Sequence, residues 1–147
     1  MRRTLRGPTL RPRRLRGQTL VEMALIAPLF IFLLIAIIEG GRFVFYAEHL
    51  NNATREGARY QVVHGNRSAD PTGPTSGDPT GEAVKQAVLD AAMVFQIDLA
   101  DVALEWSPDN NRRGTTITVR ASYEYAPIIN LFGPITVEAE SSLVINN

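Results

Sequence analysis

The sequence predicts an α+β fold, in which a long N-terminal transmembrane helix continues into a small head with one further helix and a three-stranded antiparallel sheet. Three observations lead to this prediction. Residues 20–38 form an apolar run of membrane length, helical spacing of apolar residues then continues to about residue 63, and three segments beyond residue 100 alternate apolar with polar residues. A chain of 147 residues is expected to form about one globular domain.

A basic leader precedes the apolar run. Residues 1–16 contain seven arginines and no acidic residue, whereas the remaining residues contain 15 acidic and 8 basic side chains, a net charge of −7. Arginine beside an apolar span is the usual signal for the cytoplasmic side. A nucleic-acid partner is not expected, because the leader has no aromatic residue to stack on bases. Removal of the leader would turn a neutral precursor into an acidic product.

The apolar run predicts a retained, single-pass membrane helix. Its 19 residues, 20–38, include one charge, at Glu22. A helix of ~20 residues crosses a hydrocarbon core of ~30 Å. A secretory signal has an apolar core of only ~7–15 residues, whereas 16 uncharged residues, 23–38, follow Glu22, and no small-x-small cleavage pattern comes after them. We therefore expect a cytoplasmic N-terminus, lipid around the helix and the bulk of the chain outside. Pro28 predicts a kink, since proline removes a helical donor.

The helical pattern resumes after Glu39-Gly40-Gly41, where a second bend is possible. Residues 40–64 predict an extracytoplasmic extension of the helix, with an apolar stripe and several small residues. This stripe either covers the core of the chain's own head or contacts another subunit. Residues 65–81 are rich in Gly, Pro, Ser and Thr and predict a flexible surface loop.

The head is assigned to residues 82–147. An apolar stripe predicts a helix over residues 82–95, and alternation predicts strands at 102–106, 117–125 and 135–145. The connections are a polar turn at 107–115 and a segment at 126–134 with two prolines and a glycine. An antiparallel meander with one polar face follows, stabilised by packing against helices.

No catalytic constellation is evident, so we expect neither an enzyme nor a cofactor or metal site. Cysteine is absent, which excludes disulfides and thiolate chemistry. His49 and His64 are 15 residues apart on the predicted helix, ~22 Å, which is too far to share a metal ion. Residues 109–111 (Asp-Asn-Asn) match only a fragment of a calcium loop.

The N-terminal motifs carry a family resemblance. A basic leader, a small residue, four residues and a glutamate before an apolar helix resemble the start of type IV prepilins. The longer block is similar to the TadE-like family of tight-adherence (Flp-type) pilus systems. The resembling features are Arg16-Gly17-Gln18, Leu20-Val21-Glu22, Ala27-Pro28, Gly41-Arg42 and Arg55-Glu56-Gly57-Ala58-Arg59. Many members have Phe or Tyr after the glutamate, where this chain has Met23.

The resemblance implies cleavage between Gly17 and Gln18 by a prepilin peptidase, which would make residues 1–17 the leader and residues 18–39 the transmembrane helix. The new amine at Gln18 would lie about one turn from Glu22. Because a carboxylate among apolar helices needs a cationic partner, we expect Glu22 to meet the amine of a neighbouring subunit during assembly.

The function implied is that of a minor pilin or pseudopilin-like protein with a pilin-like layout, acting in pilus assembly. Its partners would be the prepilin peptidase, other pilin-like subunits and the pilus assembly platform, at the cytoplasmic (inner) membrane; entry into the pilus itself stays open. The alternative is an uncleaved, single-pass membrane-anchored extracytoplasmic binding or sensor domain, which would keep its leader. A secreted enzyme would require cleavage near Ala36 and a catalytic site.

Overall fold

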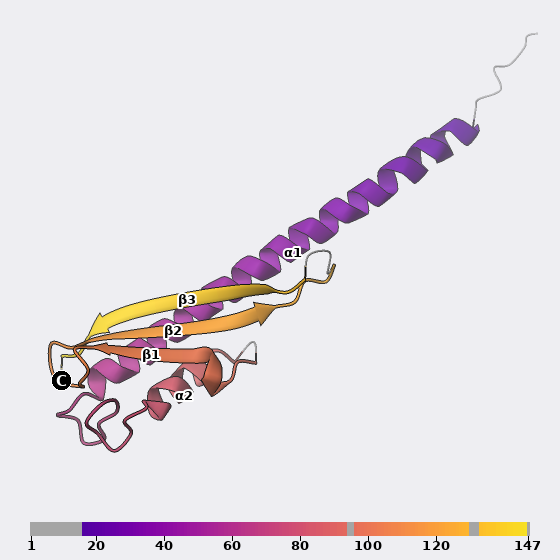
Figure 1. The fold of residues 1–147 in the computed structure, drawn as a ribbon. Helices are drawn as coiled ribbons and strands as arrows, with labels where there is room; N and C mark the ends of the chain where they lie inside the picture. Colours follow the sequence, from indigo (N-terminus) through magenta and orange to yellow (C-terminus); the bar gives the residue numbers. More distant parts are fainter. Residues whose placement is uncertain (1–15, 94–95, 130–132, 147) are drawn as a thin grey trace, which may run out of the picture. The chain divides into compact units, whose positions relative to one another are not determined.

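The computed structural model describes residues 16–93, 96–129 and 133–146. Its elements, in chain order, are α1 (Arg16–Val63), α2 (Glu82–Ala91), the 3-10 turn η1 (Leu99–Asp101), β1 (Val102–Ser107), β2 (Thr116–Tyr125) and β3 (Ile135–Val144) (Figure 1). The predicted α+β fold is confirmed: a long N-terminal apolar helix, one further α-helix and a three-stranded antiparallel sheet make up the described residues.

The chain divides into two compact units, Met1–Ile38 and Glu39–Asn147, and the division falls inside α1. We call them the N-terminal unit and the C-terminal unit. The C-terminal unit holds the second half of α1, α2 and the whole sheet. The division coincides with the end of the apolar run, at the bond between Ile38 and Glu39.

The sheet is an antiparallel meander in the order β1-β2-β3. Val102 of β1 faces Ala121 of β2, and at the far end of β2 Tyr125 faces Ile135 of β3. Alternation in the sequence sets this register, because a shift by one residue would turn the apolar face of a strand toward solvent. The strands begin and end within one residue of the predicted bounds.

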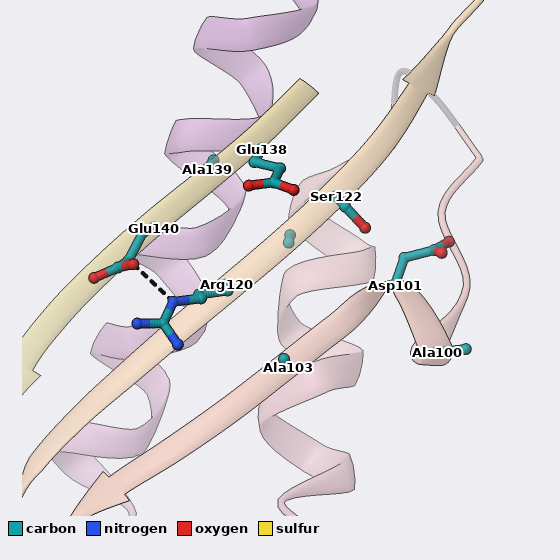
Figure 2. Close-up of a pocket in the computed structure, with 9 residues that line it drawn as sticks. Ala100, Asp101, Ala103, Arg120, Ser122, Glu138, Ala139 and Glu140 are labelled. Carbon is teal, nitrogen blue, oxygen red and sulfur yellow. Dashed lines mark hydrogen bonds and ion pairs between the residues drawn. The ribbon is translucent and has the colours of Figure 1, made fainter. Parts of the chain in front are cut away.

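The core of the C-terminal unit lies between the sheet and the two helices. Figure 2, which looks onto the outer face of the sheet, shows the ribbons of both helices behind the strands. Leu50, Ala53 and Ala58 of α1 are fully buried, as are Val84 and Val88 of α2. On the sheet the buried residues follow the predicted alternation: Val102, Ile117, Val119, Ala121, Tyr125, Val137 and Ala139. The stripe on the second half of α1 therefore covers the chain's own core.

The helix predicted over residues 82–95 is shorter in the structure. α2 ends at Ala91, because Ala92 leaves helical geometry (φ −87°, ψ 25°) while its N–H still bonds to the Val88 and Leu89 carbonyls. Val94 and Phe95 lie outside the described residues. At the start of α2, the Asp78 carboxylate accepts hydrogen bonds from the backbone N–H groups of Glu82 (2.8 Å) and Ala83 (3.0 Å). A side chain of the preceding loop thus satisfies the free donors of the first turn.

The loop at residues 65–81 packs more closely than its composition indicates. Thr72 is buried and exchanges two hydrogen bonds with the side chain of Gln61 on α1: its hydroxyl donates at 3.0 Å and its carbonyl accepts at 3.1 Å. The carbonyl also accepts from Nδ2 of buried Asn111, at 3.1 Å. Hydrogen bonds between buried polar groups hold this loop, where apolar side chains would ordinarily do so.

Two glycines of the same loop make room for Trp106 of β1. A Cβ at Gly73 (φ +90°) would lie 2.9 Å from the indole Nε1, and one at Gly81 (φ +66°) would lie 3.0 Å from the six-membered ring. Both positions also have a left-handed backbone, which glycine adopts without strain. Among the described residues, the buried Trp106 Nε1 has no hydrogen-bond partner.

We predict that Gly57→Ala destabilises the C-terminal unit by about 1–3 kcal/mol, because overpacking a filled core forces its neighbours apart. The added Cβ would collide with Cγ2 of Val88 and lie 3.5 Å from the carbonyl oxygen of Val84. Gly40→Ala on the same helix is the control: its Cβ meets nothing within 4 Å, so higher helix propensity should stabilise by about 0.5–1 kcal/mol. Thermal unfolding of the full chain in detergent, followed by circular dichroism, measures both; equal effects would contradict this packing.

Candidate assembly site

The apolar half of α1 is exposed around its whole circumference. Every large apolar side chain that is described between residues 20 and 38 is exposed except Ile35, which is half-buried; Leu25 is 79% exposed and Leu29 70%. A helix that is apolar on all sides requires an apolar environment. Within the described residues, α1 is the one helix long and apolar enough to cross a membrane, which fits a membrane anchor.

The predicted cleavage site lies in the first turn of α1. The helix begins at Arg16, so the Gly17–Gln18 peptide bond is helical, and both residues are exposed. The Gln18 side-chain amide approaches the Glu22 carboxylate, with Nε2 and Oε1 3.4 Å apart. That distance exceeds the usual range for an N–H···O bond, so the amide contributes little to Glu22. The exposed carboxylate remains available to a stronger donor.

Pro28 lies within α1, which stays helical through this residue and through Gly40-Gly41. The kink at Pro28 and the assembly role of Glu22 remain predictions.

A cluster at the start of the C-terminal unit was not predicted from the sequence. The Glu39 carboxylate of α1 accepts a short hydrogen bond from the Tyr125 hydroxyl at the end of β2, and another from the backbone N–H of Ile128, at 3.2 Å. Arg42, one turn further along α1, approaches the same carboxylate at 3.4 Å. We call Glu39, Arg42, Tyr125 and Ile128 the Glu39 cluster. It joins the helix to the C-terminal end of β2.

Aromatic rings surround the cluster. The ring of Phe43 meets that of Tyr125 edge to face, with centroids 5.7 Å apart, and Tyr46 packs against Tyr123 and Tyr125 at 5.5 Å. The Arg42 guanidinium lies 5.5 Å from the Tyr125 ring centroid, within range of a cation–π contact. Burial, together with the hydrogen bond to Glu39, raises the pKa of Tyr125 to about 12. The phenol is therefore held neutral as a hydrogen-bond donor.

The outer face of the sheet carries a shallow acidic hollow. Figure 2 shows Asp101 of η1 on one side and Glu138 and Glu140 of β3 on the other, with Arg120 of β2 between them. Arg120 bonds to Glu140 at 2.7 Å and to Glu105 at 3.1 Å, and these partners raise its pKa. With both carboxylates bound to one arginine, the arrangement has the features of a solvated ion-pair network on a polar face.

The other polar residues considered in the sequence have structural roles. His64 stacks on Tyr60, with ring centroids 3.9 Å apart, and His49 packs against Phe45. Within residues 16–93, 96–129 and 133–146, no cluster of three metal-ligating side chains occurs. Asn110 accepts hydrogen bonds from the Arg112 N–H and the Thr115 hydroxyl, so it shapes the β1–β2 turn.

Comparison with protein families returned a match to TadE-like protein over residues 17–59. That segment is TadE-like. The resemblance predicted from the N-terminal motifs is thereby confirmed for this part of the chain. No curated protein and no solved structure matched the chain.

The TadE-like segment begins at Gly17 and runs along α1 into the C-terminal unit. It contains Glu22, Pro28 and, in the Glu39 cluster, Glu39 and Arg42. Tyr125 and Ile128, their partners, lie outside it. Sequence reasoning missed the cluster because Glu39 and Tyr125 are 86 residues apart, and no local pattern connects them. The one available signal was a charged residue directly at the end of an apolar span.

We predict that Tyr125→Phe lowers the free energy of unfolding by about 1.5–3 kcal/mol near neutral pH, because it removes a hydrogen bond to a charged carboxylate. Tyr60→Phe, on α1, keeps its ring stacking on His64 and should change stability much less. Chemical denaturation of the full chain in detergent compares the two variants; equal losses would contradict a special role for the Tyr125 hydroxyl.

The contribution of Tyr125 should also depend on pH. Its pKa is raised from 10.0 to about 12, so the unfolded phenol ionises first as the pH rises. The stabilisation is complete below pH 10 and is lost progressively as the pH rises to about 12. The stability difference between wild type and Tyr125→Phe should therefore shrink over this interval, with one tyrosine ionising late in an ultraviolet titration. A stability difference that stays constant from pH 10 to about 12 would contradict the raised pKa of Tyr125.

Proposed function

We propose that this chain is a minor pilin or pseudopilin-like protein that a prepilin peptidase cleaves between Gly17 and Gln18 and that acts in the assembly of tight-adherence type pili. The observation that carries the proposal is the TadE-like match over residues 17–59. The match starts at the residue before the proposed cut and covers the apolar helix that cleavage would leave in the mature protein. The chain's role is then one of assembly rather than catalysis.

The local structure supports processing at this bond. A peptidase acts on an extended substrate, so the first turn of α1 must unwind before the Gly17–Gln18 bond is cut. Glycine lowers the cost of that unwinding, since it is less favourable than alanine in a helix by about 1 kcal/mol. A Cβ at position 17 would meet nothing within 4 Å, so among the described residues no packing contact at this position opposes the opening.

Cleavage would also create the partner of Glu22. The new terminus at Gln18 is a cationic amine, and opposite charges ~4 Å apart attract by ~4 kcal/mol at an effective dielectric of ~20. Within the described part of the chain, the Glu22 carboxylate has only the long contact to the Gln18 amide. When the apolar helices of several subunits pack together, an unpaired carboxylate would be costly, whereas one paired with a neighbour's amine is tolerated. This pairing makes cleavage a precondition for assembly.

The proposal also gives location and partners. The arginine-rich leader supports a cytoplasmic N-terminus and a C-terminal unit outside the cytoplasmic (inner) membrane. The partners are the prepilin peptidase, other pilin-like subunits and the pilus assembly platform, with lipid around the apolar helix.

One prediction of the proposed function concerns processing. Coexpressed with an active prepilin peptidase, the chain should yield a mature protein that begins at Gln18, as measured by intact mass and N-terminal sequencing. Gly17→Ile should block the cut, because the small residue before the bond is replaced by a branched one, whereas Gly7→Ile in the leader should not. A wild-type chain that keeps its leader under these conditions would favour the uncleaved, membrane-anchored binding or sensor domain.

Another prediction of the proposed function concerns assembly. Glu22→Ala should be cleaved and inserted as the wild type is, but its incorporation into sheared pilus fractions, or its crosslinking to other pilin-like subunits, should fall strongly. Glu48→Ala removes an exposed carboxylate from the same helix outside the apolar run and serves as the control. Normal incorporation of the Glu22→Ala protein would contradict the proposed pairing with the neighbouring amine.

A further inference from the structure

Exposed apolar side chains gather around the Glu39 cluster. Ile128 in the β2–β3 connection is 62% exposed, and Ile129 beside it is 37% exposed. Ile135, the first residue of β3, is 45% exposed and pairs with Tyr125 of the cluster. On α1, directly after the cluster's Glu39 and Arg42, three further apolar residues are exposed. The apolar collar, as we call this surface, consists of Phe43, Val44, Phe45, Ile128, Ile129 and Ile135.

Glu39 connects the collar to the end of the apolar span. Glu39 follows Ile38 directly in the chain, and its carboxylate bonds to the backbone N–H of Ile128 and to the Tyr125 hydroxyl. Phe43, Val44 and Phe45 follow Ile38 by five to seven residues of one helix, ~7–11 Å along its axis. The interfacial layer on each side of a bilayer is ~5–8 Å thick. A helix that crosses the hydrocarbon core up to Ile38 therefore brings the start of the collar, at Phe43, to the outer part of this layer.

Two polar groups beside the collar are hydrogen-bonded within the protein. The N–H of Ile128 is satisfied by Glu39, and the Tyr125 hydroxyl donates to the same carboxylate. Unsatisfied polar groups are costly in an apolar medium, so such internal pairing is what a loop at the membrane surface requires. The Arg42 side chain is 36% exposed, and arginine and aromatic rings are common at this level of a membrane.

We propose that the apolar collar lies in the interfacial layer of the membrane, so that the C-terminal unit rests on the lipid surface through a second contact besides the transmembrane helix. This inference rests on the proposed membrane span at residues 20–38. The occupant is lipid, because the collar follows the proposed lipid-exposed span on the same helix and is separated from it only by residues 39–42. Anchored at Glu39, the β2–β3 connection would hold the sheet close to the membrane until the subunit is extracted.

The absence of cysteine from the sequence gives a direct test with single-cysteine variants of the full chain. Each variant is labelled with a polarity-sensitive fluorophore and reconstituted at low density into phosphatidylcholine–phosphatidylglycerol vesicles that carry nitroxide lipids, with the quencher either near the headgroup or deep in the acyl chains. Ile135→Cys and Val144→Cys form a matched pair, since they stand at the two ends of β3 and are 45% and 48% exposed. Ile128→Cys probes the loop, and Leu34→Cys probes the span.

The shallow quencher should reduce the fluorescence at positions 128 and 135 several-fold more than at 144, and the deep quencher should act on position 34. If position 34 is quenched but 128 and 135 behave like 144, the collar proposal is overturned and the membrane anchor stands. If position 34 is not quenched, the anchor itself fails. A label at 128 whose emission shifts to the blue without lipid quenching would place a protein neighbour on the collar and would also overturn the proposal.

Discussion

One helix has to satisfy two environments, and the rest of the structure follows from this constraint. Up to Ile38, α1 is apolar on every side and exposed, as lipid or neighbouring helices require. After Glu39 the same helix has a polar face and a narrow buried face, which includes Ala53, Gly57 and Ala58. Those small residues let the sheet and α2 approach closely. A three-stranded sheet is marginal by itself, so its stability depends on packing against the same helix whose apolar half fits a membrane anchor.

The Glu39 cluster lies at the residue where one environment gives way to the other. A carboxylate directly after an apolar span would be costly if it were buried without partners. Here the Tyr125 hydroxyl, the Ile128 N–H and Arg42 all contact this carboxylate, and the Phe43 ring packs against that of Tyr125. The cluster therefore fixes the end of β2 to α1. The hydrogen bond between Glu39 and the Ile128 N–H fixes the position of the loop that bears the exposed Ile128 and Ile129.

Local patterns were sufficient to predict most of the fold. Alternation located the three strands and the buried side of β2, and helical spacing located α1 with its stripe, because both patterns report which face a residue presents. The helix over residues 82–95 was predicted too long, since apolar residues beyond Ala91 continue the stripe while the backbone leaves helical geometry at Ala92. Ile135 and Leu143 have the phase of buried residues, yet both are exposed, although Val137, Ala139 and Ile145 in the same phase are buried.

Contacts between distant residues could not be predicted from one sequence. Glu39 with Tyr125 and Thr72 with Asn111 are pairs of common residue types that become partners only after the meander and α1 are packed. The composition of residues 65–81 was misleading for the same reason. A segment without large apolar residues still joins the core when glycine lets a tryptophan lie against the backbone and a buried threonine finds amide partners. The candidate cleavage site, in contrast, is a linear motif and was visible at once.

The two units differ in charge: the C-terminal unit is acidic, whereas the apolar run of the N-terminal unit has one charged residue, Glu22. Beyond residue 16 the chain carries a net charge of −7, and the outer sheet face holds several of those carboxylates around Arg120. Exposed ion pairs add little stability, so the main effect of Arg120 is to reduce repulsion between Glu105 and Glu140. Neighbouring C-terminal units would still repel one another at distances within a Debye length of ~8 Å. If the chain assembles as proposed, attraction between subunits would come from the apolar helices, where Glu22 is the one charged residue in the run 20–38. In the proposed assembly, the acidic surface of the C-terminal unit would thus direct association to the apolar helices, and the proposed pairing of Glu22 would make association dependent on a free amine.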